Sequence, residues 1–161
     1  MNHTRKKYIP SPLTLGEWLL ISCSFSIVLL CARVIVTGYD TYIFLVWNLF
    51  LAFIPYLISN WLTTSIATIK SKLRLAAAIT AWLLFIPNSF YILTDLFHLD
   101  EIASAPKWFD LLLLLSFALN GLLLGIISLR QMENLLKQSN GKNFSRLIIF
   151  AVMWLNAYGI Y

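Results

Sequence analysis

The sequence predicts an all-α, multi-pass transmembrane helical bundle of about five spans. Of its 161 residues, 60% are hydrophobic and only 12% are charged, whereas soluble domains carry about 25% charged residues. The mean hydropathy is positive, and several apolar runs approach the length of about 20 residues that a helix needs to cross a bilayer. A soluble domain could not bury so much apolar surface, and a disordered chain would be far less hydrophobic.

Residues 1–16 form a basic amino-terminal arm, and residues 17–36 form the first expected span. The arm carries Arg5, Lys6 and Lys7. A basic start followed by an apolar stretch also describes a secretory signal peptide. No small-x-small cleavage site follows in a polar context, and further apolar runs come after it. We therefore expect a retained span at the start of a single transmembrane domain over residues 17–161.

The remaining expected spans are residues 42–62, 75–93, 108–129 and 144–161. Pro55 interrupts the second span and Pro87 the third. Because proline removes a backbone donor and clashes with the preceding turn, we expect a kink at Pro87, close to Asn88. The last apolar stretch is short for a span. We expect it to be a truncated form of a longer natural segment.

The basic residues alternate between connections in the way that membrane topology predicts. All of them except Arg33 and Lys107 fall on the amino-terminal arm or on the second and fourth connections. Because cytoplasmic loops collect Lys and Arg, we expect a cytoplasmic amino terminus and an external residue 161. Nucleic-acid binding is not expected, since no soluble basic face with stacking aromatics is present. The acidic residues at the expected external ends are Asp40, Asp95, Asp100, Glu101 and Asp110.

Polar residues in and beside the spans predict an externally facing binding pocket. Side chains from residue 88 to residue 98 recur every three or four positions and would follow one helical face. Polar groups in hydrocarbon are costly and often functional. The alternative is that they only hydrogen-bond between helices or form a solvated loop. The candidate pocket residues are Asn48, Asn88, Tyr91, Thr94, Asp95, His98, Asp110 and Asn120.

Asp95, His98 and Asp110 form a candidate metal site. Asp95 and His98 are three residues apart, so on one helical face they could ligate a divalent metal together. One imidazole with carboxylates would suit zinc, manganese or iron. Without a metal, the Asp95 carboxylate could instead orient the imidazole and raise its basicity. A purely structural role for these residues is the third alternative.

Gly121 and Gly125 form a Gly-x-x-x-Gly pair in the fourth span. Such a pair allows another helix to approach closely. We expect it to pack within the chain, and the alternative is a homo-oligomer formed through this glycine face. The lipid bilayer is the expected environment in either case.

Besides a structural partner that packs through the glycine face, three functions remain open from the residues alone. The first is an inner-membrane protein that binds a ligand in the external polar pocket. The second is a membrane enzyme, with or without a metal, in which His98 acts on a lipid or envelope substrate. The third is a transport component, for which the proline-interrupted spans and the deep Asn120 would be the argument. The sequence contains no Gly-rich phosphate loop, Gly-x-Ser-x-Gly elbow or His-Glu-x-x-His pair.

A combination of spaced motifs resembles a bacterial membrane family known as domain of unknown function 1361. The resemblance covers residues 42–161 and implies a multi-pass inner-membrane protein without an established activity. Family members usually continue past the Leu155-Asn156-x-Tyr158-Gly159-x-Tyr161 pattern into a further basic, Asn-containing stretch. The motifs that carry the resemblance are Trp47-Asn48-Leu49-Phe50-Leu51-Ala52 with Pro55, Pro87-Asn88 with Tyr91, Thr94-Asp95, His98-Leu99, Trp108-Phe109-Asp110 and Asn120-Gly121.

Overall fold

The computed structural model describes residues 14–66, 69, 71–99 and 105–160, and these residues form helices and connections without a strand. The predicted all-α class is confirmed. The elements are α1 (Leu15–Thr37), α2 (Phe44–Ser65), α3 (Lys72–Tyr91), the 3₁₀-helix η1 (Ile92–His98), α4 (Lys107–Asn140) and α5 (Lys142–Ile160).

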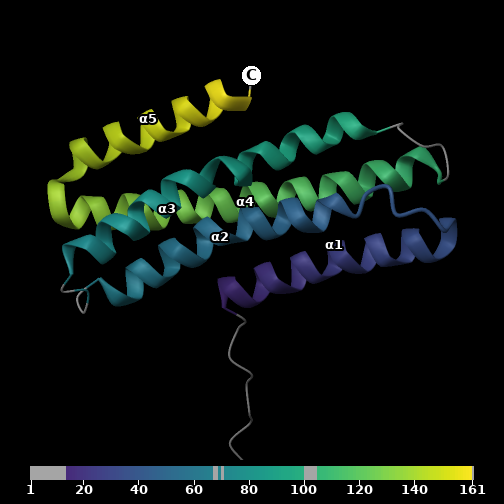
Figure 1. Cartoon of the computed structure of the whole chain (residues 1–161), viewed down its shortest axis with the longest axis horizontal. Coiled ribbons are helices and arrows are strands. Elements are labelled where there is room, and N and C mark those ends of the chain that lie inside the picture. Colours follow the sequence, from purple (N-terminus) through teal and green to yellow (C-terminus); the bar gives the residue numbers. More distant parts are fainter. Residues whose placement is uncertain (1–13, 67–68, 70, 100–104, 161) are drawn as a thin grey trace, which may run out of the picture.

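Helices α1 to α4 lie side by side with alternating direction, and α5 folds back along α3 and α4 (Figure 1). One end of the bundle holds the end of α1, the start of α2, η1 and the start of α4. We call it the η1 end, and it lies at the right of Figure 1. Helix α4 contacts every other element and is the central helix.

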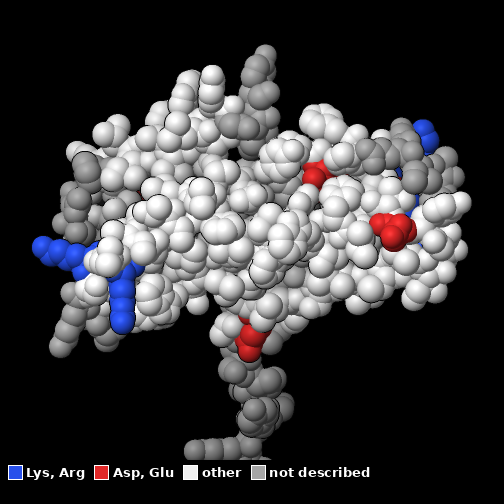
Figure 2. Space-filling model, viewed as in Figure 1, with Lys and Arg blue, Asp and Glu red and all other residues white. Residues whose placement is uncertain are grey.

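Four segments are long and apolar enough to cross a membrane. They are Leu15–Thr37, Phe44–Ser65, Lys72–His98 and Lys107–Gln138, and Ser145–Tyr158 is a shorter apolar helix. Large apolar side chains on their outer surfaces are exposed, as expected where lipid rather than water surrounds the bundle. Figure 2 shows the Lys and Arg side chains at the two ends of the visible face, most of them at the left, while some Asp and Glu side chains lie nearer its middle.

Local sequence explains where several helices begin and end. Thr14 caps α1 through a capping box, in which its hydroxyl accepts from the Glu17 amide and the Glu17 carboxylate accepts from the Thr14 amide. Gly38 ends α1 in the left-handed region at φ 71°. Helices α2 and α3 continue through Pro55 and Pro87.

Polar side chains join the helices inside the bundle. The Trp82 indole donates to the Ser128 hydroxyl (2.8 Å), which donates to the Pro55 carbonyl (2.9 Å). The Ser89 hydroxyl donates to the Ala52 carbonyl (3.1 Å). Each contact satisfies a buried polar group where no water is present.

Both glycines of the Gly-x-x-x-Gly pair pack against the chain's own α3–η1 segment. A Cβ atom on Gly121 would collide with Cγ2 of Ile92, and one on Gly125 would lie 2.8 Å from Cβ of Ser89. Contacts this close are not accommodated without a shift of the neighbouring atoms. The glycines therefore let α4 approach α3 and η1 within one molecule. Whether the chain also forms a homo-oligomer stays a prediction.

Candidate functional site

The 3₁₀ geometry of η1 decides which of its side chains face the bundle. In a 3₁₀-helix residues three apart lie directly above one another. Ile92 and Asp95 are buried and His98 lies above them, half-buried. Tyr91, which directly precedes Ile92, is exposed, and so is Phe97, which directly precedes His98. The α-helical face expected from the sequence is thus divided into an inward row and an outward row.

The Asp95 carboxylate is the centre of the inward row. Asp95 is only 2% exposed, and both of its oxygens accept from the side-chain amide of Asn48, at 3.0 and 2.9 Å. Asn48 reaches it from the first turns of α2. The structure thus places these two predicted pocket residues in direct contact. A neutral amide supplies a hydrogen bond to the carboxylate but no compensating charge.

His98 lies at the outer end of the same row. Its ring meets the Phe44 ring edge-on, with centroids 5.1 Å apart. Its backbone carbonyl accepts from the Tyr42 hydroxyl at 3.1 Å. The imidazole is also near enough to Asp95 to interact with the carboxylate electrostatically. His98 is therefore the imidazole neighbour of the buried carboxylate.

Asp110 makes a different contact from the one that its spacing to His98 suggests. It binds Arg33, with Nε to Oδ1 at 2.7 Å and Nη2 to Oδ2 at 3.2 Å. The side chains are 0% and 5% exposed. This buried bidentate pair joins α1 to the start of α4. Arg33 was not among the candidates drawn from the sequence, although an arginine inside an apolar run is itself a signal of a buried partner.

Tyr42 connects the two carboxylate groups. The Arg33 guanidinium carbon lies 4.4 Å from the centroid of the Tyr42 ring, in a cation–π contact. The hydroxyl of the same tyrosine donates to His98. The η1 end therefore holds one connected group of buried and half-buried side chains, which we call the η1-end cluster: Asn48, Asp95, His98, Tyr42, Arg33 and Asp110.

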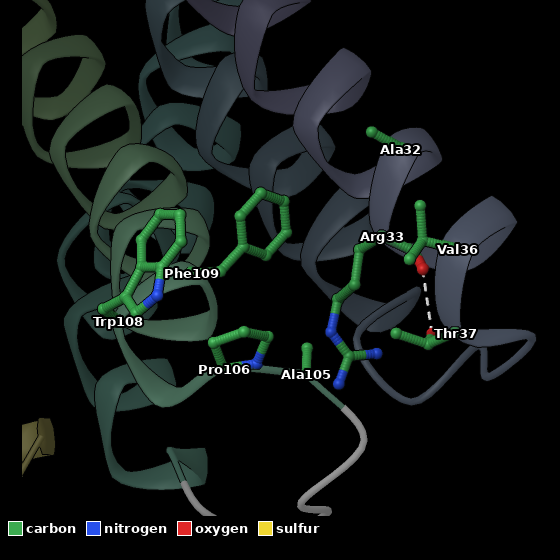
Figure 3. Close-up of a pocket in the computed structure, with 8 residues that line it drawn as sticks. All are labelled: Ala32, Arg33, Val36, Thr37, Ala105, Pro106, Trp108 and Phe109. Carbon is green, nitrogen blue, oxygen red and sulfur yellow. Dashed lines mark hydrogen bonds between the residues drawn. The ribbon is translucent and has the colours of Figure 1, made fainter.

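A groove of about 250 Å³ lies beside Arg33, between the end of α1 and the start of α4 (Figure 3). Its lining is apolar apart from Arg33 and Thr37. The Thr37 hydroxyl donates to the Arg33 carbonyl at 2.8 Å, and the guanidinium extends toward Ala105 and Pro106 in Figure 3. Because Asp110 already neutralises this guanidinium, the groove offers apolar surface rather than a free charge.

The other predicted pocket residues lie apart from Asp95. Asn120 is buried and its amide donates to the Ser22 carbonyl (3.1 Å) and the Ser26 hydroxyl (2.9 Å), so it joins α4 to α1. The Asn88 amide donates to the Phe85 carbonyl of its own helix. The Thr94 hydroxyl donates to the Tyr91 carbonyl. Asn120, Asn88 and Thr94 thus have helix-joining or local contacts, and Tyr91 takes part through its backbone carbonyl.

The three candidate metal ligands do not converge. Asp110 is bound to Arg33, whereas Asp95 is bound to Asn48. Within the described ranges, no three His, Cys, Asp or Glu side chains are grouped so that they could hold a metal ion. Asp100 and Glu101, which the sequence places near His98, lie outside the described residues.

Comparison with known proteins identifies the family of the chain. Neither the curated proteins nor the solved structures provide a match. A family model described as "Protein of unknown function (DUF1361)" matches residues 47–161, which include α3, η1, α4, α5 and nearly all of α2. The chain therefore belongs to the DUF1361 family of proteins of unknown function.

Proposed function

We propose that this protein spans a bacterial inner membrane with its amino terminus in the cytoplasm, and that its η1 end faces outward and binds a small positively charged ligand at Asp95. The apolar helices fit a lipid bilayer. The alternation of basic residues between connections supports the orientation, because cytoplasmic loops are enriched in Lys and Arg.

The observation that carries the ligand proposal is the contrast between two buried carboxylates at the same end. Arg33 neutralises Asp110 with two charge-assisted hydrogen bonds. Asp95 is equally buried, and among the described residues its hydrogen bonds come from one neutral amide, with the half-buried His98 imidazole as an electrostatic neighbour. A buried charge is costly unless it is compensated. A cation or protonated amine bound to Asp95 would supply that charge, with Asn48 holding the carboxylate in place.

Thermal unfolding of the purified protein in detergent tests this proposal. Na⁺, K⁺, Mg²⁺, Ca²⁺ and ethanolammonium are titrated separately at constant ionic strength, with choline as the balancing cation. At a concentration about 100-fold above its Kd, a ligand that binds only the folded state stabilises it by about 2.7 kcal/mol. We expect at least one of these cations to raise the Tm of the wild type and to leave Asp95→Asn unmoved.

Asp40→Asn is the matched control, because Asp40 is an exposed carboxylate at the same end of the bundle. This variant should respond to the cation as the wild type does. The proposal would be wrong if none of the five cations shifts the wild-type Tm, or if Asp95→Asn keeps the full response.

The enzyme and transport alternatives gain less from the geometry. A metal-dependent enzyme would need a third ligand beside Asp95 and His98, and Asp110 is already bound to Arg33. A transport route through Asn120 would need that amide to be available, but it joins α4 to α1. The Asp95 carboxylate, which is hydrogen-bonded to a neutral amide and not paired with an arginine, therefore favours binding.

A further inference from the structure

A second, mostly apolar groove lies between the α3–η1 segment and α5. Its volume is about 190 Å³, and its lining residues are Phe90, Leu93, Met153, Asn156 and Ala157. The amide of Asn156 is the polar side chain among them. No residue of the η1-end cluster lines this groove.

The Asn156 amide has an unsatisfied donor. Asn156 is 6% exposed, and within the part of the chain that the structure describes its Nδ2 atom has no hydrogen-bond partner. An unpaired amide destabilises the fold where there is no water to receive the bond. Asn156 is itself one of the residues that line the groove. Because χ2 of asparagine is broad, a turn of the amide would bring Nδ2 within reach of an acceptor held there.

We propose that this groove holds an acyl chain of a membrane glycerolipid, and that the Asn156 amide donates to the ester carbonyl of that chain. The size of the groove favours a lipid chain over another helix, because a helix is about 10 Å wide and cannot enter a recess of about 190 Å³. The exposed side chains of this part of α5, Phe150, Met153 and Trp154, are large. Helix–helix interfaces in membranes instead favour small residues.

The aromatic residues beside the groove fit the depth of a lipid ester. Tyr91 follows Phe90 and is 53% exposed, and Tyr158 follows Ala157 and is 77% exposed. Exposed tyrosines collect at the boundary between hydrocarbon and headgroups. Ester carbonyls lie at the same boundary, so the Asn156 amide and its acceptor would meet without moving the lipid out of the bilayer.

Native mass spectrometry of the purified protein with two forms of phosphatidylglycerol tests the proposal. One form has two ester-linked chains, and the other is its diether analogue, which lacks the carbonyls. One hydrogen bond in a membrane protein corresponds to about a three- to tenfold difference in affinity. We expect the wild type to retain the diester lipid three- to tenfold more tightly than the diether lipid. If the wild type retains the diester and diether lipids equally, the proposal is overturned, whatever the variants show.

Three variants separate the amide from the groove. Asn156→Leu should lose the preference for the diester, whereas Asn60→Leu, the same change at an exposed position of α2, should keep it. Ala157→Phe should weaken both lipids because it fills the groove. A diester preference that survives in Asn156→Leu would overturn the proposal. The proposal would also be overturned if the wild type forms a dimer, shows no preference between the two lipids, and loses the dimer in Asn156→Leu. A second copy of the chain would then cover the amide.

Discussion

At the scale of single residues, the Arg33–Asp110 pair connects segments 77 positions apart in the chain. The guanidinium is fully enclosed, with its two bonds to the carboxylate and the Tyr42 ring against its face. Taking two charges out of water costs as much as their attraction returns, so such a pair is not itself a large source of stability. Its value lies in specifying one position of α1 against α4.

This balance predicts unequal effects of single and double substitutions. Arg33→Met or Asp110→Leu alone leaves an uncompensated buried charge and should lower the unfolding free energy by about 3 to 5 kcal/mol. The double variant Arg33→Met/Asp110→Leu removes both charges and should recover most of that loss. Unfolding in detergent, followed by circular dichroism against SDS concentration, measures the difference.

Lys137→Met provides the control for charge removal. Lys137 pairs with Glu133 at 2.8 Å on a partly exposed surface of α4, so its loss should change stability little. A double variant as unstable as the two single changes combined would show that Arg33 and Asp110 act independently, contrary to the buried pairing.

The residues of the site were predictable in part. Asp95, Asn48 and His98 stand out in the sequence because polar groups are rare in apolar runs. The pairing of Asp110 with Arg33 was not, since it depends on α1 and α4 being neighbours, which no local spacing encodes. Proximity to His98 in the sequence favoured a shared metal site instead.

At the scale of elements, the change from α3 to η1 separates the expected polar face. The repeat of three to four residues predicted Asn88, Tyr91, Thr94, Asp95 and His98 on one α-helical surface. The tighter winding from residue 92 onward puts Asp95 above Ile92 and turns Tyr91 outward. The tighter winding occurs where η1 packs against α4 and α2. Local propensity did not predict this switch, because those contacts are with segments distant in the sequence.

The packing of η1 on α4 gives a second prediction. Gly121→Ala would place a methyl group against Ile92 and should lower the unfolding free energy by about 1 to 3 kcal/mol. Ile92→Ala shortens the opposing side chain and leaves a cavity. The double variant should therefore be more stable than the sum of the two losses predicts, by about 0.5 to 3 kcal/mol. The same SDS titration measures this coupling.

Gly16→Ala is the control for glycine replacement in a helix. Its new Cβ would lie 3.3 Å from the Tyr56 hydroxyl, the far end of a long side chain that can shift. Little loss is expected there. Additive losses in Gly121→Ala/Ile92→Ala would argue against the contact between these two positions.

At the scale of the whole molecule, the class of fold followed directly from the sequence. Long apolar runs separated by short polar connections leave few alternatives, and the helix bounds agree with the expected spans to within a few residues, except where α3 continues into η1 and α4 extends to Asn140. The expected span ends at residue 129 because the last turns of α4 are polar, and the Glu133–Lys137 spacing in them predicts only one or two short helical turns, whereas the helix runs on to Asn140. Such turns remain helical when they project beyond the bilayer.

The charge pattern predicts the orientation of the molecule. Reporter fusions after Asp40 and after Ala105 should show external positions, and fusions after Ser71 and after Gly141 should show cytoplasmic ones, because Lys and Arg retain loops in the cytoplasm. An alkaline phosphatase and green fluorescent protein pair reports the two sides oppositely. An external position after Ser71 would reverse the proposed topology and place Asp95 on the cytoplasmic side.

The winding of η1 also controls where its carboxylate points. Successive residues turn by about 120° in a 3₁₀-helix and about 100° in an α-helix. Rewinding Ile92–His98 as α-helix would therefore swing Asp95 by about 60° relative to Ile92, away from the Asn48 amide. In this one segment, backbone amides that donate to the carbonyl three residues earlier present the Asp95 carboxylate to Asn48. Amides that donated to the carbonyl four residues earlier would withdraw it.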